Sequence, residues 1–384
     1  MSKIVILAGD FPPIAGGISI YLQSLTRLLS PDEVVIIGLP TPGSQDFDKK
    51  QTYRIKRLSI PEHWGTKSQQ FKFLAPFYFW QLIKEKHIDY VICGQAHHSL
   101  VLPAWLNKMI RGVPFSVIAH GTDICSIQAY SYKRKINSVL QTSRAIFANS
   151  RKTSEFVEKA GVKPELIHII NPMVDTTLQT SSISPINLRQ AYSLEGKKCL
   201  LTVCLLVERK GVDTVIRAMP EIVKKVPDAH YVIVGNGVYD SELKKLTRTL
   251  GMQSYITFIG FVAHENMREF YEMCDVFVLT SRDIPGKPQT EGFGLVFLEA
   301  NLFGKPVIAS RTGGIADAVL DGQTGLMVEP NNPSETAAAV IRLLTDKPLA
   351  RQLGAAGHNR VLKDFSGESA VQKIREIMLS KGEE

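Results

Sequence analysis

Short apolar runs rich in Val and Ile recur along the whole chain, separated by segments with helical spacing and charge. In the first half these runs cover residues 3–9, 33–39, 90–94, 115–121, 145–150 and 166–171. In the second half they cover 199–206, 230–235, 255–262, 276–281, 306–310 and 325–329, with helix-like segments such as 212–225 and 241–250 between them. Continuous apolar runs of this length are typical of strands buried on both faces. Their alternation with helices predicts an α/β protein with parallel, doubly wound sheets.

A polar segment between Asp175 and Ser193 interrupts this alternation. It has no hydrophobic period and contains Pro185, so we interpret it as a linker. The 384 residues suffice for two domains of about 150–200 residues each. We expect one Rossmann-like domain over 1–180, a second over 181–365, and a C-terminal helix in 366–384 that packs back toward the first. Ligands bind beyond the carboxyl ends of such strands, so the expected active site is a central cleft that the two sheets face.

The positive charge of the chain is confined to its first half. Residues 1–185 carry 21 Lys and Arg against 13 Asp and Glu, a difference of +8, whereas residues 186–384 carry 24 of each. Segment 133–163 alone has eight basic residues and two acidic ones. A solvated basic face is one interpretation, and attraction to an anionic membrane or a phosphorylated acceptor is the other. Nucleic acid is not an expected partner, because no recognisable binding module is present.

Cysteine usage and hydropathy favour a cytoplasmic protein. The five cysteines form no CxxC pair, so neither a metal site nor a disulfide framework is expected. The apolar core of MSKIVILAGD is too short for a signal peptide. The longest apolar stretch, 71–83, is interrupted by Lys72 and Gln81 and is shorter than the roughly 20 residues that a membrane span needs. We therefore expect a chain that does not cross a bilayer.

The segment TEGFGLVFLEA at 290–300 is the most informative for chemistry. Glu291 and Glu299 lie eight residues apart, with Gly292 and Gly294 after the first. Glycine lets backbone amides approach an anion, and the start of a helix directs its free N–H groups to the same place. If the whole segment is helical, the two carboxylates lie about 12 Å apart along its axis. That separation is too large for a retaining-glycosidase pair and suits the two ends of a ligand with a central diphosphate. A solvent-facing amphipathic helix is the alternative.

Three further segments combine strand ends with polar or flexible residues. Arg209 and Lys210 lie at a strand-to-helix turn, where cations can hold phosphate oxygens, although an exposed charged turn would look the same. Gly16-Gly17 follows a Pro-rich turn without forming a GxGxxG fingerprint, and Gly235-Asn-Gly237 is a weak partial match. His120 closes the apolar run 115–121 and is followed by Gly-Thr-Asp123. A dehydrogenase is disfavoured by the missing fingerprint.

Together these segments resemble the GT-B retaining glycosyltransferases of family four, also called group 1 glycosyltransferases, over nearly the whole chain. The matching pieces occur in the order of the family: Gly16-Gly17, His120 to Asp123, Arg209-Lys210-Gly211, Gly260 to Val262, Glu291 to Glu299, and Thr312-Gly313-Gly314. The long loop before Glu291 is most similar to that of bacterial mannosyltransferases that build phosphatidylinositol mannosides. The resemblance implies an acceptor-binding first domain and a nucleotide-sugar-binding second domain.

The resemblance also assigns roles. It implies catalytic roles for His120, which lies near the reacting sugar, for Arg209 and Lys210, which stabilise the leaving diphosphate, and for Glu291, which binds the sugar hydroxyls. It assigns the ribose to Glu299 and places donor contacts at Gly16, Gly17, Gly237, Phe261, Val262, Gly292, Phe293, Gly294, Leu295, Val296 and Glu299. The implied reaction needs no metal or other cofactor: GDP-mannose is the favoured donor, a UDP-sugar the second choice, and a lipid-linked, polyol or glycan hydroxyl the acceptor.

Two positions depart from the family pattern. The family usually reads GRL before the RKG turn, so Leu205 stands where a phosphate-binding arginine is usual. Met173 stands where the family often has the glycine of NGVD, and methionine does not easily adopt a positive φ. A sugar-nucleotide epimerase or hydrolase of the same fold, and a sugar-nucleotide-binding protein without turnover, therefore remain alternatives. In every case the protein would be cytoplasmic, or docked on the inner face of the cell membrane.

Overall fold

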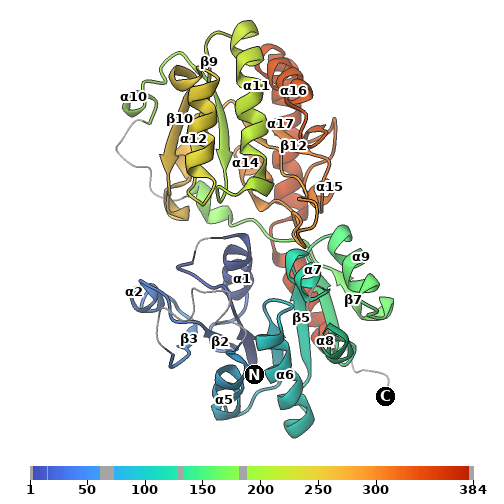
Figure 1. The fold of residues 1–384 in the computed structure, drawn as a ribbon. Coiled ribbons are helices and arrows are strands. Elements are labelled where there is room, and N and C mark those ends of the chain that lie inside the picture. Colours follow the sequence, from blue (N-terminus) through green and yellow to red (C-terminus); the bar gives the residue numbers. More distant parts are fainter. Residues whose placement is uncertain (1–2, 15, 61–72, 129–132, 181–187, 380–384) are drawn as a thin grey trace. The chain divides into compact units, whose positions relative to one another are not determined.

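The computed structural model describes residues 3–14, 16–60, 73–128, 133–180 and 188–379. The chain forms two compact units, the first from Met1–Met173 with Gly367–Glu384 and the second from Val174–Ser366. Each unit has a parallel sheet with helices packed on it (Figure 1). The first unit thus ends earlier than the expected boundary at residue 180. Part of the expected linker, 181–187, lies outside the described residues.

The sheet of the first unit has the strand order β3-β2-β1-β4-β5-β6-β7, and all neighbouring strands pair in parallel. Six of its strands lie within the six apolar runs of the first half, which confirms those predictions: β1 (Ile4–Leu7), β2 (Val34–Gly38), β4 (Tyr90–Cys93), β5 (Phe115–Ala119), β6 (Ala145–Ala148) and β7 (Ile167–Ile169). The edge strand β3 (Arg54–Arg57) was not predicted. Its sequence RIKR is partly exposed and carries no apolar run.

Helices cover both faces of this sheet, and the C-terminal helix is one of them. α18 (Glu368–Leu379) buries Val371 and Ile374 in the core of the first unit. Arg375 pairs with Glu33 at 2.8 Å, and Arg144 donates to the carbonyl of Ile377 at 3.0 Å. The other α-helices are α1 (Gly17–Arg27), α2 (Ser44–Asp48), α5 (Ala75–Lys84), α6 (His98–Arg111), α7 (Thr122–Gln128), α8 (Lys133–Leu140) and α9 (Arg151–Lys159).

The sheet of the second unit has the order β10-β9-β8-β11-β12-β13 and is also parallel throughout. Its strands follow the apolar runs of the second half to within a few residues: β8 (Lys198–Val203), β9 (Ala229–Val234), β10 (Ile256–Gly260), β11 (Val276–Leu279), β12 (Val307–Ser310) and β13 (Gly325–Val328). This order, in which the second strand flanks the first and the fourth lies on the other side, is that of the dinucleotide-binding fold.

Helices also cover both faces of the second sheet. The predicted helices at 212–225 and 241–250 are confirmed as α11 (Val212–Lys225) and α12 (Asp240–Thr249). The remaining α-helices are α10 (Leu188–Ala191), α13 (Arg268–Met273), α14 (Leu295–Leu302), α15 (Ile315–Ala318), α16 (Pro333–Thr345) and α17 (Lys347–Asp364). No helix in the described ranges is long and apolar enough to cross a membrane.

Candidate functional site

The strand order of the second sheet reverses between β8 and β11, which are hydrogen-bonded neighbours. Chain segments leave these two strands toward opposite sides, so the carboxyl edge between them is the usual ligand site of an open parallel sheet. Arg209 and Lys210 follow β8 in a short 3₁₀ turn, Glu208–Lys210. Ser281 and Arg282 follow β11. The candidate site therefore begins with polar and cationic groups at the switch point.

Glu291 is the centre of an ionic cluster at this edge. Its Oε2 accepts from Lys210 Nζ at 2.6 Å, from Arg209 Nη1 at 3.1 Å and from Ser281 Oγ at 3.1 Å. The residue is 9% exposed. Burial alone would raise the pKa of Glu291, but the nearby charges of Lys210 and Arg209 outweigh it and lower the pKa to about 2. The sequence-predicted Arg209, Lys210 and Glu291 thus form one contact group, with a carboxylate that is ionised at neutral pH.

Gly211 allows the turn that carries these cations to lie against the end of β11. It adopts a left-handed conformation with φ 66°, and a Cβ at this position would lie 1.8 Å from the carbonyl oxygen of Thr280. The Thr280 hydroxyl in turn donates to the Gly211 carbonyl at 2.8 Å. Only glycine fits this approach, so the RKG sequence fixes the distance between the cationic turn and the neighbouring strand end.

Arg282, which was not among the predicted residues, contacts the turn that carries Arg209 and Lys210. Its guanidinium is 9% exposed, lies 2.9 Å from Asp213 Oδ1 and donates to Asn331 Oδ1 at 3.0 Å. Its backbone N–H donates to the carbonyl of Arg209 at 2.7 Å. Arg282 therefore links β11, the cationic turn and the first turn of α11. The sequence signal for Arg282 was its position directly after the apolar run 276–281, where a strand ends.

The glutamate pair differs from the helical arrangement considered in the sequence analysis. α14 begins only at Leu295, so Glu291 lies in the preceding loop and the 12 Å helical separation does not apply. Glu299 lies inside α14, is 3% exposed and accepts from the Tyr271 hydroxyl at 2.5 Å. It is not a solvent-facing residue. The two carboxylates therefore have different environments, one ionic and one within the packed helix.

The N-terminus of α14 is open toward the loop that carries Glu291. Gly294 is its N-cap with φ 91°, and it supplies no side-chain cap for the N–H groups of the first turn, where Leu295 and Val296 lie. Phe293 is buried, with its ring 5.9 Å from that of Phe365, and it anchors the loop that includes Gly292. The geometry leaves the backbone amides of this turn available for an anion.

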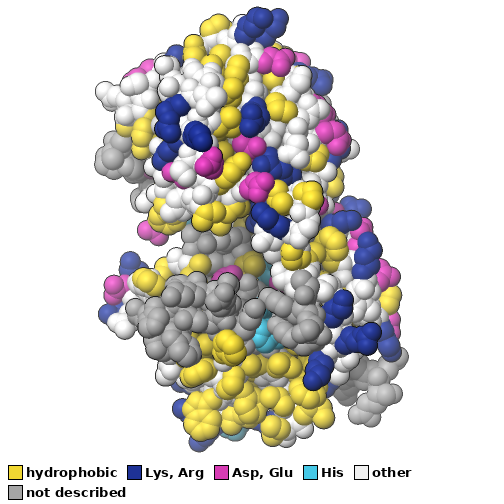
Figure 2. Space-filling model, viewed as in Figure 1, with side chains coloured by type: hydrophobic (Ala, Val, Ile, Leu, Met, Phe, Trp, Pro, Cys, Tyr) yellow, Lys and Arg dark blue, Asp and Glu magenta, His cyan; other side chains and the backbone are white. Residues whose placement is uncertain are grey.

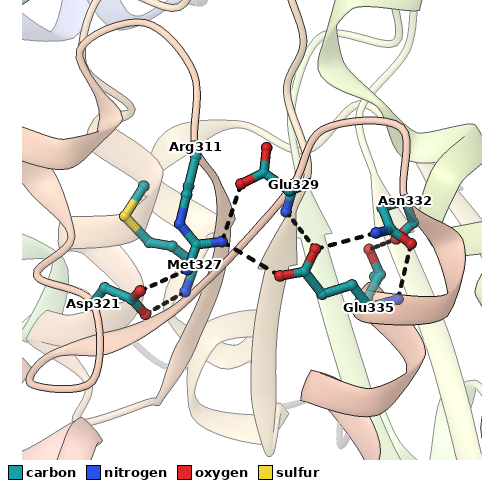
Figure 3. A network of polar contacts seen from close by, with 7 residues as sticks. Arg311, Asp321, Met327, Glu329, Asn332 and Glu335 are labelled. Carbon is teal, nitrogen blue, oxygen red and sulfur yellow. Dashed lines mark hydrogen bonds and ion pairs between the residues drawn. The ribbon is translucent and has the colours of Figure 1, made fainter.

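The turn after β12 holds the backbone of Glu291. Gly314 N–H donates to the Glu291 carbonyl at 2.8 Å, and a Cβ on Gly313 would lie 2.1 Å from the same oxygen. An ion-pair network at the start of this turn braces it (Figure 3). Arg311 contacts Asp321 at 2.7 Å, with further contacts to two glutamates, Glu335 at 3.3 Å and Glu329 at 3.5 Å.

The other predicted donor contacts of this unit lie after β9 and β10, at the same edge of the parallel sheet. A Cβ on Gly237 would lie 2.2 Å from the carbonyl oxygen of Leu206, so this glycine is required by packing between two loops. Phe261 is 59% exposed and Val262 is half-buried directly after β10. Leu205, the departure from GRL, is 58% exposed. Its side chain therefore adds apolar surface where a cation is usual.

His120 lies at the corresponding edge of the first unit and is 7% exposed. Its Nε2 donates to the carbonyl of Gly94 at 2.9 Å, and its ring packs edge-on against Tyr21 with centroids 5.6 Å apart. Asp123 orders the same loop, because its Oδ1 accepts from the His120 N–H at 2.9 Å. The imidazole thus has a fixed orientation through a nitrogen that already holds a backbone partner.

The switch point of the first unit lies between β1 and β4, and a hydrogen bond joins the loops that follow them. Gln95 Nε2 donates to Asp10 Oδ2 at 2.9 Å. Burial raises the pKa of Asp10, and the Gln95 hydrogen bond only partly offsets it. Gly16 and Gly17 lie at the start of α1, are exposed, and would have nothing within 4 Å of an added Cβ. Their small size is therefore not required by packing within the described residues.

Met173, the second departure, is accommodated without strain. It is 1% exposed, and it is not among the described non-glycine residues with positive φ. Its thioether lies 3.1 Å from the position of a Cβ on Gly367. The chain thus packs this methionine where the family often has glycine.

Two family models match the chain in succession. Residues 15–178 match "Glycosyltransferase Family 4", and residues 186–360 match "Glycosyl transferases group 1". The chain is 28% identical to a GDP-mannose-dependent α-(1-6)-phosphatidylinositol monomannoside mannosyltransferase of Mycolicibacterium smegmatis, over 99% of both chains. It is 26% identical to the corresponding enzyme for the monoacylated substrate from Corynebacterium glutamicum, over 99% of this chain and 98% of the relative.

The fold is shared with a solved structure. The Anabaena protein HepE, crystallised with UDP-glucose, superposes with a TM-score of 0.82 at 21% identity, over 99% of this chain and all of HepE. At this identity the likeness supports the fold alone. It confirms the predicted GT-B architecture of two Rossmann-like parallel-sheet domains.

Proposed function

This chain belongs to the family 4 and group 1 glycosyltransferases, and from that premise we propose that it transfers mannose from GDP-mannose to a hydroxyl of a lipid-linked acceptor, with retention and without a metal ion. Relatives that are named GDP-mannose-dependent phosphatidylinositol monomannoside mannosyltransferases match nearly the whole length of the chain. The proposal concerns the donor, the sugar, the acceptor and the stereochemistry. That the protein is a glycosyltransferase is part of the premise.

The ionic cluster around Glu291 is the observation that supports the proposal most. Lys210 and Arg209 are oriented at one carboxylate oxygen, next to the uncapped N-terminus of α14. A diphosphate bound at this edge would meet both cations and the helix amides, and these groups would stabilise the charge that develops as it leaves. Glu291 would remain ionised and could accept hydroxyl hydrogens of the sugar.

Retention would follow from a reaction on one face of the sugar. The acceptor hydroxyl would attack the anomeric carbon from the side of the departing diphosphate, and a phosphate oxygen would take the acceptor proton. The resemblance assigns His120 to the reacting sugar. Because its Nε2 is bonded to the Gly94 carbonyl, the imidazole would contact the sugar through its other ring atoms. No carboxylate nucleophile is assigned.

The donor base is the part of the proposal with two candidates. The named relatives use GDP-mannose, whereas HepE was crystallised with UDP-glucose. We favour GDP-mannose because those relatives match nearly all of the chain at higher identity. Calorimetric titration of the protein with GDP and UDP decides between them, and tighter binding of UDP would redirect the proposal to a UDP-sugar.

Product analysis tests the reaction itself. We expect the protein to convert GDP-mannose to a mannosylated lipid when phosphatidylinositol monomannoside is added, with an α-configured product by NMR. A matched Glu291→Ala variant provides the background. Free mannose or an epimerised sugar nucleotide formed from donor alone, unaffected by acceptor, would indicate a hydrolase or epimerase instead. Donor binding without any turnover above the variant would indicate a binding protein, an option that Leu205 keeps open.

A further inference from the structure

Arg57, the last residue of the edge strand β3, extends past β2 to the loop that follows β1. Its Nη2 donates to the carbonyl of Pro12 at 2.6 Å, and its Nη1 donates to the carbonyl of Leu39 at 2.9 Å. Pro12 follows β1 and Leu39 follows β2, so one guanidinium joins the carboxyl ends of three neighbouring strands. The Arg57 side chain is 13% exposed, so these contacts are largely shielded from water.

The turn at Pro12 depends on a side chain because its own backbone offers few donors. Pro12 and Pro13 have no N–H groups, so neither can donate a hydrogen bond to a neighbouring strand. Pro12 is buried, and a buried carbonyl without a partner costs free energy. Arg57 supplies this partner, and its Cζ lies 5.8 Å from the centroid of the buried Phe11 ring. Arg57 therefore contacts both the backbone and the aromatic side chain of the turn.

Asp48, the last residue of α2, fixes the orientation of the Arg57 guanidinium. It accepts from Arg57 Nε at 3.0 Å and from Nη2 at 2.7 Å, a two-point contact between two planar groups. Charged side chains of both signs lie over α2 in Figure 2, and an exposed pair there, such as Lys49 with Asp46, contributes little to stability. The Asp48 side chain, by contrast, is 21% exposed. All three nitrogens of the Arg57 guanidinium thus donate to partners within the first unit, which suits a positioning role rather than contact with a ligand.

The turn that Arg57 holds is next to the switch point of the first unit. Asp10 directly precedes Phe11 and accepts from Gln95 at 2.9 Å. It is therefore held by Gln95 on one side and by the Arg57-bound backbone on the other. Gln95 is 9% exposed, and its Oε1 has no hydrogen-bond partner among the described residues. A buried acceptor of this kind is satisfied when a ligand hydroxyl donates to it, and this edge of a parallel sheet is where ligands bind.

We propose that Arg57 is a positioning residue for the acceptor: it holds the turn that contains Asp10, so that this residue and Gln95 bind a hydroxyl of the acceptor sugar or polyol. The nature of that hydroxyl rests on the proposed function, whereas the role of Arg57 in the turn does not. A purely stabilising ion pair with Asp48 is the competing explanation. It predicts that Asp48 matters as much as Arg57, and that loss of either lowers stability without altering the use of the acceptor.

Steady-state kinetics of the full chain with GDP-mannose and phosphatidylinositol monomannoside, together with GDP calorimetry, test the proposal. Arg57→Met should lower kcat/KM for the acceptor about tenfold or more and leave GDP affinity unchanged, because the proposed diphosphate site lies in the second unit. Arg57→Lys should lose nearly as much, since an ammonium group lacks the planar fork that reaches Asp48 and two carbonyls at once.

Two further variants separate this role from the ion pair and from charge alone. Asp48→Asn leaves the Arg57 guanidinium with its two carbonyl partners, so kcat/KM for the acceptor should change less than about threefold. Arg54→Met is the matched control, because Arg54 lies on the same strand with a side chain that is 59% exposed. It should behave as the wild type does.

Hydrogen exchange of the free protein tests the same role without any substrate. Amides in peptides covering residues 8–14 should exchange about tenfold faster in Arg57→Met and in Arg57→Lys, because the turn opens more often without its partner. The same peptides in Asp48→Asn, and peptides covering β4 in every variant, should exchange as in the wild type. If Arg57→Met does not fold, Arg57→Lys carries the test.

The proposal is wrong if neither Arg57 variant changes exchange at residues 8–14, or if exchange changes there while kcat/KM for the acceptor does not. It is also wrong if Asp48→Asn lowers kcat/KM for the acceptor as much as Arg57→Met does, or if GDP affinity falls in parallel with it. A wild type that forms no product from this donor and acceptor would overturn the proposed function instead. The exchange result would then decide by itself whether Arg57 holds the turn.

Discussion

The two units of this chain share the order of their first six strands but differ in the electrostatics of their switch points. In the first unit the loops after β1 and β4 meet through Asp10 and Gln95, and burial raises the pKa of the carboxyl group. In the second unit the loops after β8 and β11 surround Glu291, whose pKa is lowered to about 2 despite its burial. The comparison indicates that the carboxyl edge of the second sheet is suited to an anion, whereas the carboxyl edge of the first sheet is suited to neutral hydroxyl groups.

The largest effect is expected from breaking the buried pair below the ionic cluster. Arg282→Met leaves Asp213 with an uncompensated charge in a buried position, so we expect the second unit to lose about 3–5 kcal/mol of stability. Urea denaturation measures this loss when the unfolding of each unit is monitored by hydrogen exchange in peptides from that unit. The first unit should keep its exchange protection.

A double variant controls for the loss of packing. Arg282→Met with Asp213→Leu removes both charges, so most of the stability should return, because the penalty comes from the charge left behind. If the double variant is as unstable as the single one, the arginine acts through its contacts with Asn331 or through packing instead.

The second prediction removes the cation closest to Glu291. Lys210→Ala should lower kcat/KM at least tenfold, which corresponds to about 1.4 kcal/mol of transition-state stabilisation. The physical reason is that Leu205 leaves few cations at this turn. Steady-state kinetics with the donor measure the effect, and Lys287→Ala is the matched control, since Lys287 forms an exposed pair with Glu208. An unchanged kcat/KM for Lys210→Ala would exclude this lysine from the diphosphate site.

The third prediction separates the two glutamates by ligand. Glu299→Gln should weaken GDP binding several-fold, because the resemblance assigns it to the ribose. Glu291→Gln should weaken the sugar nucleotide and turnover but leave the affinity for GDP nearly intact. Calorimetry with GDP and GDP-mannose measures both. Tyr271→Phe is a useful companion, since it removes the hydroxyl bonded to Glu299 and should have a smaller effect of the same kind. Equal losses of both ligands in both glutamate variants would contradict the assignment.

The fold was largely predictable because buried parallel strands leave a direct signal. Twelve apolar runs predicted twelve strands, and the edge strand β3 escaped because Arg54–Arg57 has no apolar run. The grouping of Arg209, Lys210 and Glu291 required the resemblance, since these residues are far apart in sequence. The position of Arg282 after an apolar run was visible in the sequence, but its pairing with Asp213 was not, because only the three-dimensional turn after β11 brings the two together. The helical separation of Glu291 and Glu299 was wrong because glycines delay the start of α14 until Leu295.

The smallest expected effects are the most direct test of the comparison between the two switch points, because they should have opposite signs. Burial raises the pKa of Asp10, so ionisation opposes folding: its contribution is favourable below about pH 4 and is lost as the pH rises through the folded-state pKa. Asp10→Asn should therefore stabilise the first unit at pH 7, with the gain shrinking toward pH 3. For Glu291 the folded-state pKa is lowered, so its contribution is fully present above its ordinary value of 4.5 and is lost as the pH falls to about 2. Glu291→Gln should destabilise the second unit at pH 7, and this loss should disappear in acid. Hydrogen exchange at pH 7 and at about pH 2, corrected for intrinsic rates, measures the stability of each unit separately. Changes of the same sign in both units would show that the two edges do not differ in the way their pKa values indicate.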